Sequence, residues 1–423
     1  MRRPGSGGRG GAPTGNDLFT MGVTFLTAYD IIKDNVSKCY GELCALSRFI
    51  YEHPERCFEE RESSAALQAL LEKHGFAVTA GYCGLETSFL AEKRGLSGGP
   101  VVCIMAEYDA LPMGHACGHN LIAAISAGAA IALGGMLEGT PGAVRVIGTP
   151  AEEGGGGKVY LCARGGFEGS DFALQVHPGR QNLVQRGGLA VRSVEIEFFG
   201  RMAHSSRPEQ GINALTAVLQ TFSMLDAQRA LLPIKANVNG IITDGGRANN
   251  VIPEHAACSF CARANDVRDL QRVTEAIERA AQAAAALTGA RVELRKGILY
   301  AERYPNREMD ERYKAHLEAM GETVEYPKPQ MKFGSSDVGN VSLMIPTIQP
   351  YIRICDEDCH TAGFLEAARS ERAQEQMAKA AAALAMTGYD LLTDEALRRR
   401  VREEFARTAP AYARSELGYE ELK

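Results

Sequence analysis

The chain has 423 residues, which exceeds the roughly 100 to 200 residues of one compact domain, so two or three domains are expected. The composition is 45% hydrophobic and 23% charged, as in an ordinary soluble globular protein. The formal net charge of -6 provides no concentrated basic surface. This argues against nucleic acid and an anionic membrane as partners and favours a small-molecule substrate.

The cysteines and the N-terminus bear on where the protein resides. Eleven cysteines are scattered from Cys39 to Cys359 without the spacing of a disulfide framework, so we expect reduced thiols in a cytoplasmic protein. Residues 1–25 are rich in glycine and lack an apolar core, so we expect a disordered leader and no export signal. The longest apolar run, 121–137, is shorter than the about 20 residues of a membrane span and favours a buried helix.

The first half of the chain alternates between helical and strand-like segments. Helices are expected at 31–53 and 63–74, where apolar residues recur at helical spacing. Three nearly continuous apolar runs then have the pattern of strands covered on both faces: 101–107, 143–149 and 171–177. Helical stretches separate these runs at 120–137 and 158–167. This βαβ alternation predicts a doubly wound, mostly parallel α/β sheet.

From residue 188 the pattern changes to β-α-β-β-α-β, which is a complete ferredoxin-like unit. We therefore predict an inserted α+β domain over residues 188–298. It separates two segments of one catalytic domain, 26–187 and 299–423. The second segment returns to strand and helix, with a strand-like run at 347–355.

Polar side chains follow each predicted catalytic strand, at the sheet edge where ligands bind in doubly wound folds. The first strand leads through Asp109 into the stretch "GHACGHN" at 114–120, and the third ends on His177. The second leads into the pair Glu152 and Glu153. The groups that can converge are Cys117, His119, one glutamate of the pair, His177 and, after the run at 347–355, His360.

Thiolate, imidazole and carboxylate groups are the ligands that zinc takes at about 2.0 to 2.3 Å. Five such groups exceed the needs of one tetrahedral ion, so a two-metal site is the simplest fit. A single histidine at a strand end is more often an ordinary hydrogen-bonded residue, and the metal interpretation therefore depends on all these groups converging. His115, two residues before Cys117, is expected to contact its own loop instead.

The adjacent glutamates Glu152 and Glu153 cannot both bind one ion from an extended chain, because neighbouring side chains point apart. One is expected to ligate, and the other is free for proton transfer. A free glutamate beside metal-activated water is the arrangement of a hydrolase with a general base. The alternative is a solvated acidic turn before "GGGG".

Six motifs carry a family resemblance: "EYDALPMGHACGHNLIA", "GTPAEEGGGGK", "GRMAHSS", "NNVIPE", "GSSDVGNVS" and "CHTAGF". They resemble the aminoacylase and carboxypeptidase superfamily of metal amidohydrolases, in the branch with hippurate hydrolase and auxin-conjugate hydrolases. Within that branch they look closest to β-alanyl-lysine dipeptidase and aminobenzoyl-glutamate hydrolase. The resemblance extends over residues 45–393.

The resemblance implies a role for each matching residue. Glu152 corresponds to the general base, and Asp109 to an aspartate that orients a metal-binding residue. Two divalent ions are implied, zinc or manganese, which share these ligand types. The implied metal ligands are Cys117, His119, Glu153, His177 and His360.

The resemblance also gives the inserted domain a role as a lid that forms a homodimer. His204 corresponds to a histidine that reaches the partner's active site and stabilises the oxyanion, and Asn250 to a substrate-binding residue. The branch's common aspartate after the C-G-H motif is Asn120 here, and this departure leaves the exact substrate open.

The expected function is therefore a cytoplasmic metal-dependent amidohydrolase or dipeptidase. Its expected substrate is a small N-acyl amino acid or unusual dipeptide, of β-alanyl-lysine or aminobenzoyl-glutamate type. A catalytically silent binding protein on the same fold is the alternative, but it predicts the loss of a ligand or of Glu152. A structural zinc protein predicts four closed ligands and no spare carboxylate.

Overall fold

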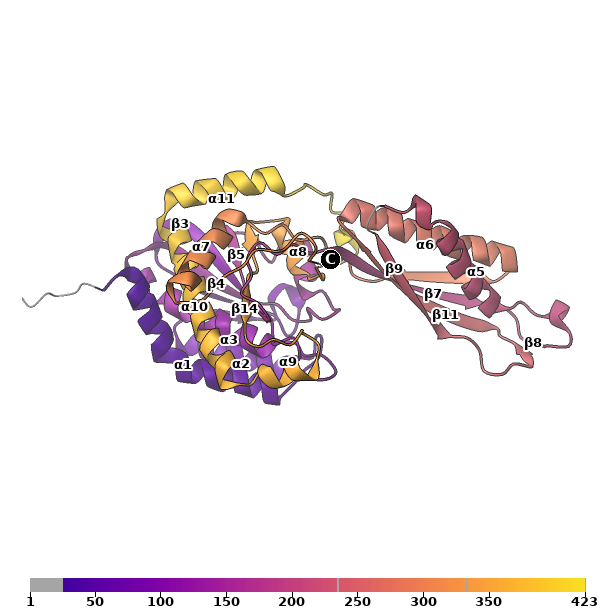
Figure 1. Cartoon of the computed structure of the whole chain (residues 1–423), viewed down its shortest axis with the longest axis horizontal. Coiled ribbons are helices and arrows are strands. Elements are labelled where there is room, and N and C mark those ends of the chain that lie inside the picture. The colour runs from indigo at the N-terminus through magenta and orange to yellow at the C-terminus, as the bar shows by residue number, and fades with distance from the viewer. Residues whose placement is uncertain (1–25, 234–235, 332, 423) are drawn as a thin grey trace, which may run out of the picture.

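The computed structural model describes residues 26–422 except 234–235 and 332. The leader predicted over residues 1–25 lies outside the described residues. Figure 1 shows a larger body of helices around a sheet, and an elongated smaller body that extends from it. The second is built from residues in the middle of the chain.

The larger body is organised around a six-stranded sheet in the order β1-β2-β4-β3-β5-β13. Neighbours among the last four strands are parallel, whereas β1 pairs with β2, and β2 with β4, in antiparallel orientation. The mostly parallel sheet predicted from the sequence is thus confirmed, with an antiparallel hairpin at one edge. The strands are β1 (Ala77–Ala80), β2 (Phe89–Arg94), β3 (Leu96–Ala106), β4 (Pro141–Gly148), β5 (Phe172–Leu174) and β13 (Thr347–Ile348).

Helices cover both faces of this sheet, as expected of a doubly wound fold. Alternate residues of β3 point to opposite faces. Ile104 belongs to the apolar cluster with α1 (Ala28–Glu52), α3 (His119–Gly134) and α10 (Glu371–Thr393). Met105 belongs to the cluster on the other side, with α4 (Gly157–Ala163) and α8 (Val338–Ser342). The remaining helices of this body are α2 (Arg61–Lys73), α7 (Arg307–Ala319), α9 (Ala362–Ala367) and α11 (Glu395–Thr408).

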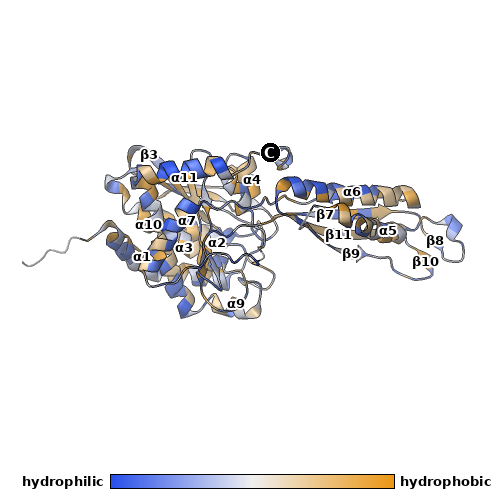
Figure 2. Cartoon of the chain, turned by 45° about the horizontal axis from the view of Figure 1, so that its top comes forward, coloured by the Kyte–Doolittle hydropathy of each residue, from blue (hydrophilic) through white to orange (hydrophobic). Residues whose placement is uncertain are grey.

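The apolar helix α3 lies at the centre of the larger body, in contact with α1 and α10. Its sixteen residues are all buried. Among the described residues, this helix with its short extension to Gly139 is the one stretch long and apolar enough to cross a bilayer, but 89% of its apolar window is buried inside the protein. The prediction of a buried helix is confirmed. In contrast, α11 is largely hydrophilic and lies on the outside of this body (Figure 2).

Two of the predicted strands are interrupted. The run 171–177 forms β5 and then a separate strand, β6 (His177–Gly179), and the run 347–355 forms β13 and β14 (Tyr351–Arg353). β6 and β14 pair with each other outside the six-stranded sheet. Pro350, between β13 and β14, has no N–H for a ladder, although its carbonyl still accepts the His177 N–H at 2.9 Å. His177 therefore begins a second small ladder instead of ending a core strand.

The smaller body contains a four-stranded antiparallel sheet in the order β12-β7-β11-β9, with α5 and α6 packed on it. This order and the β-α-β-β-α-β succession are those of the ferredoxin-like unit that the sequence predicts. A short ladder of β8 (Ala203–His204) and β10 (Val251–Ile252) lies at its far tip (Figure 1). The main elements are β7 (Ala190–Phe199), α5 (Ala214–Ala227), β9 (Asn237–Asp244), β11 (His255–Ala264), α6 (Val267–Thr288) and β12 (Arg291–Lys296).

Candidate metal centre

Cys117 and His119 are placed by a left-handed turn at the start of α3. Gly118 between them has φ +78°, and a Cβ at this position would lie 2.5 Å from Pro178 Cγ. Both the conformation and the close approach favour glycine. The turn thus presses the "ACGH" stretch against β6, which carries His177.

The five predicted ligands and Glu152 come together in three overlapping clusters, and in each cluster the donor atoms lie within 4.8 Å of one another. Cys117 belongs to two of the clusters, as do His119 and Glu153. The clusters are Cys117, His119 and His177; Cys117, Glu153 and His360; and His119, Glu152 and Glu153. Their elements are far apart in sequence but meet at one edge of the sheet.

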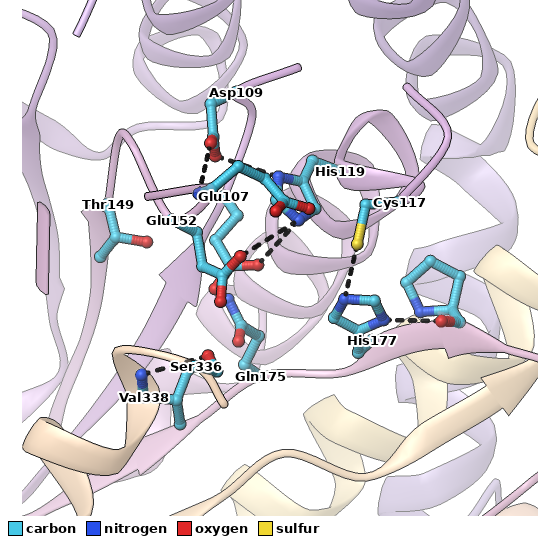
Figure 3. A network of polar contacts seen from close by, with 12 residues as sticks. Glu107, Asp109, Cys117, His119, Thr149, Glu152, Gln175, His177, Ser336 and Val338 are labelled. Carbon is cyan, nitrogen blue, oxygen red and sulfur yellow. Dashed lines mark hydrogen bonds and ion pairs between the residues drawn. The ribbon is translucent and has the colours of Figure 1, made fainter. Parts of the chain in front are cut away.

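Short contacts connect the members of these clusters (Figure 3). Cys117 Sγ lies 3.5 Å from His177 Nε2, and His360 Nε2 lies 3.1 Å from Glu153 Oε1. His360 has φ +68°, a strained conformation for a residue with a side chain, and its N–H donates to the Ala116 carbonyl at 2.8 Å. The strained residue is thus the one whose backbone binds the "ACGH" stretch.

The imidazole of His177 presents a lone pair to the cluster. Its Nδ1 lies 2.6 Å from the Pro178 carbonyl oxygen. Because a carbonyl oxygen only accepts, Nδ1 carries the hydrogen and Nε2 faces Cys117 unprotonated. Burial lowers the pKa of His177 to about 4, so the ring is neutral at physiological pH, as a metal ligand must be.

Asp109 fixes the other histidine of the turn. One oxygen, Oδ1, lies 3.0 Å from His119 Nδ1, and Oδ2 accepts the backbone N–H of Glu153 at 2.9 Å. Burial opposes ionisation of Asp109, but the charge and hydrogen bond of His119 outweigh it and hold the pKa of the carboxyl at about 2. The arrangement leaves His119 Nε2 turned to the cluster, fully buried and without a hydrogen-bond partner. A buried imidazole nitrogen without a partner fits a metal ligand.

Glu152 lies in the same group without a strong partner of its own. Its carboxylate is 4.0 Å from His119 Nε2, while its carbonyl accepts from the Tyr300 hydroxyl at 2.7 Å. The preceding residue, Ala151, has φ +59° and donates its N–H to Glu60 at 2.9 Å. Burial, and then the charges of the surrounding acids, raise the pKa of Glu152 well above its usual range.

A buried ionic group beside the cluster was missed by the sequence analysis. Lys158 Nζ lies 2.6 Å from Glu107 Oε1 and 2.8 Å from Asp337 Oδ1, and all three side chains are fully buried. Glu107 Oε2 is 3.5 Å from His119 Nε2. The available signal was a lysine among the glycines and apolar residues at the start of α4, because a cation buried there needs an anionic partner.

The remaining candidates lie elsewhere in this chain. His204 is exposed at the far tip of the smaller body, where the Asn250 carbonyl accepts the Ser205 N–H at 2.9 Å. His115 belongs to none of the three clusters. Its ring lies 6.4 Å from that of Tyr51 on α1, and neither ring nitrogen has a hydrogen-bond partner. Within its own loop, the His115 carbonyl accepts the Gly118 N–H at 3.0 Å.

Two adjoining cavities open at the cluster. The inner cavity has a volume of about 250 Å³, and its lining includes Arg186, Tyr351 and the cluster residues Cys117, Glu152, Glu153, His177 and His360. The outer cavity has a volume of about 500 Å³ and shares three lining residues with the inner one: Arg186, Tyr351 and Cys359. The two volumes together are those of a site for a small molecule.

Comparison with known proteins settles the family. A model of the M20 type, described as a peptidase dimerisation domain, matches residues 187–288. The Xaa-Arg dipeptidase of Homo sapiens is 36% identical over 406 residues, which covers 89% of this chain and 92% of that protein. The chain belongs to the M20 peptidase family. It is therefore a hydrolase of amide or peptide bonds, and the resemblance identified from the motifs is confirmed.

Other M20 relatives agree with this membership. A p-aminobenzoyl-glutamate hydrolase component of Escherichia coli (strain K12) is 31% identical and covers 72% of this chain and 68% of that protein. A Bacillus subtilis structure described as a dinuclear metal-binding M20 peptidase has a TM-score of 0.63 at 24% identity, covering 83% of this chain and 98% of that one. The structure shows the shared M20 fold of catalytic and inserted domains.

Proposed function

We propose that this M20 hydrolase uses two divalent metal ions to cleave the amide bond of a small N-acyl amino acid or unusual dipeptide. The observation that carries the proposal is the position of Glu152. It lies within the cluster of metal-type ligands and is engaged by no ion pair as close as that of its neighbour Glu153 with His360. A structural site has no use for such a spare carboxylate.

Cys117, His119, Glu153, His177 and His360 would hold the two ions, because their donor atoms form overlapping clusters. Thiolate, imidazole and carboxylate suit zinc, and manganese shares the oxygen and nitrogen ligands. When bound, such ions polarise a carbonyl and make water acidic enough to react near neutral pH.

Glu152 acts as the proton carrier of the reaction. It accepts a proton from the attacking water as oxygen adds to the carbonyl carbon. It then delivers that proton to the amine as the C–N bond breaks, which yields a carboxylic acid and an amine. Asp109 holds His119 and the backbone of Glu153 in place during these steps through its two carboxylate oxygens.

We propose a homodimer in which His204 and Asn250 complete the partner's site. His204 Nδ1 accepts the Ser206 N–H at 3.1 Å, so a neutral ring carries its hydrogen on Nε2. That N–H is free to stabilise an oxyanion. In its own chain His204 lies too far along the smaller body to do so (Figure 1).

The exposed edge of the smaller sheet supports this dimer. β9 is an edge strand on which Ile241 and Ile242 are 59% and 45% exposed. Unpaired backbone groups and exposed isoleucines favour pairing with another strand. The opposite edge, β12, is protected by charged side chains: Arg291, Glu293, Arg295 and Lys296. We therefore place the dimer contact along β9.

We also propose a cytoplasmic location. All eleven cysteines are free in the structure, which suits a reducing compartment.

A substrate panel tests the proposed reaction. Purified protein loaded with zinc, manganese or cobalt would be assayed with β-alanyl dipeptides, aminobenzoyl-glutamate, and N-acetyl and N-benzoyl amino acids. We expect at least one of these amides to be cleaved, and removal of metal by a chelator to abolish turnover. Binding of these compounds without cleavage under any metal would identify a catalytically silent binding protein instead.

A further inference from the structure

We infer that the outer cavity is a subsite for an acidic group of the substrate, additional to any main-chain carboxylate, and that Arg186 selects it. The inference rests on the proposed function, because it concerns the same reaction site. It is carried by the position, the fixed backbone and the unneutralised charge of Arg186.

Arg186 lies on the wall shared by the two cavities. The inner cavity holds the cluster residues, and the outer one extends past Tyr351 towards Arg180 and Asp358. A substrate that extends from the inner cavity into the outer one lies against this wall. The part that projects into the outer cavity then meets the guanidinium of Arg186.

The backbone that carries Arg186 is held in one conformation. The preceding residue, Gln185, has φ +56°, and its N–H donates to Asp310 Oδ2 at 2.9 Å. From the other side, the buried Arg303 donates to the carbonyls of Arg186 at 3.1 Å and Gly187 at 2.9 Å. Strained backbone fixed by its surroundings is characteristic of ligand-binding segments.

The side chain of Arg186 is directed to the reaction site by aromatic rings. Its guanidinium lies 4.4 Å from the ring centroid of Tyr351 and donates to the Tyr351 hydroxyl. The ring centroid of Phe333 lies 5.7 Å from the same guanidinium. The Tyr351 ring in turn stacks on His177 at 4.8 Å and 22°. The cation is thus separated from a candidate metal ligand by a single aromatic ring.

The charge of Arg186 is not neutralised by an ion pair with any of the described residues. In contrast, Arg180 at the rim of the outer cavity pairs with Asp358 at 2.9 Å. Arg303 adds a second guanidinium behind the wall, and its Nη1 has no hydrogen-bond partner. A guanidinium that lines a cavity without a counter-ion matches a carboxylate, which it can bind through two parallel hydrogen bonds.

An acidic substituent would therefore be favoured in the outer cavity, and a lysine or arginine side chain would face like charge. Matched substrates test this in two arms. In the first arm the acid is on the leaving amino acid, with N-benzoyl-glutamate compared with N-benzoyl-glutamine. In the second it is on the acyl group, with N-glutaryl-glycine compared with N-pentanoyl-glycine.

We expect the acidic member of at least one pair to have a kcat/KM about 10- to 100-fold higher, as for a hydrogen-bonded charged group. Arg186→Gln should remove this preference while leaving the neutral substrate nearly unaffected. Arg186→Lys, which keeps the charge but not the planar fork, should retain part of it. The exposed Arg94→Gln, on β2, is the matched control and should leave the preference unchanged.

Two results would overturn the inference. One is the absence of a preference for the acid in both arms. The other is an equal loss for charged and neutral substrates in Arg186→Gln, which would assign Arg186 to the main-chain carboxylate that all four substrates share.

Calorimetry with the zinc-loaded protein separates this inference from the proposed function. In at least one arm, the acid should bind more tightly than its amide, glutamate than glutamine or glutarate than glutaramate, and Arg186→Gln should abolish the difference. If no amide is cleaved but this difference is present, the reaction is wrong and the subsite is correct. If amides are cleaved without a preference and the acids bind no better, the subsite is wrong and the reaction stands.

Discussion

Asp109 and His119 are joined by a hydrogen bond of 3.0 Å from His119 Nδ1, and the second oxygen of the same carboxylate binds the Glu153 N–H. We predict that Asp109→Asn weakens metal binding about 10- to 100-fold, as for other partners of ligating histidines. The amide keeps one acceptor but loses the charge and the second acceptor. Competition with a chelator measures the change. The exposed Asp34→Asn is the control, and equal affinity in both variants would contradict this role.

The adjacent glutamates offer a matched pair of variants. Glu152→Gln should lower kcat by about 10²- to 10⁴-fold, because the proton carrier is lost. It should retain its metal. Glu153→Gln should lose metal as well as activity. Turnover and metal content of the two proteins, measured side by side, check both assignments, and exchanged phenotypes would reverse the roles of the two residues.

We predict that Lys158 stabilises the fold beside the candidate metal centre through its ion pairs with Glu107 and Asp337. Lys158→Met leaves Glu107 and Asp337 buried without their cation, and we expect a loss of about 3 to 5 kcal/mol in unfolding free energy. Adding Asp337→Asn to Lys158→Met should recover part of this loss, since one unpaired charge is removed. Denaturant unfolding of the metal-free proteins measures both effects. An unchanged midpoint for Lys158→Met would show that the ionic group contributes nothing.

Patterns local in sequence predicted most of the fold. The apolar run at α3 and the β-α-β-β-α-β succession each indicate their structure within one continuous segment. The break between β5 and β6 was not predicted, because it depends on pairing of β6 with β14, which is about 170 residues away. The "CGH" and "EE" motifs are also local in sequence, and they predicted metal ligands and a general base.

Residues that act through distant partners had no such signal. Lys158 forms ion pairs with Glu107 and Asp337. Arg186 forms hydrogen bonds with Tyr351 and Arg303. Neither residue stands in a motif that predicts those contacts. Only the three-dimensional structure shows these contacts.

Asp310 should make stability depend on pH. Burial raises the pKa of its carboxyl from 3.8 to about 8, so between these values the folded state holds a proton that the unfolded state has released. Its contribution to stability is fully present below pH 4 and is lost as the pH rises towards 8. Asp310→Asn should not show this decrease in stability with pH, because asparagine does not ionise.

The difference in Tm between Asp310→Asn and wild type should therefore become more positive from pH 5 to pH 8. Thermal melts across this range measure it, with Asp34→Asn as the control that keeps the wild-type dependence. A constant difference would show that Asp310 is ionised in the folded protein.

Subunit mixing tests the proposed role of His204 across the proposed dimer. His204→Ala and Glu152→Ala should each be nearly inactive, whereas an equal mixture allowed to exchange should recover about a quarter of wild-type activity. One site in each mixed dimer then has both residues intact. The absence of recovery at every mixing ratio would place His204 outside the active site.

The proposed two-metal site makes a direct prediction about the metal content of the protein. Elemental analysis of metal-replete wild-type protein, after removal of free ions, should give two transition-metal ions per chain. Cys117→Ser should reduce that number, because the thiol of Cys117 belongs to two of the three clusters. Wild-type protein that cleaves its substrate while holding no bound ion would contradict the account.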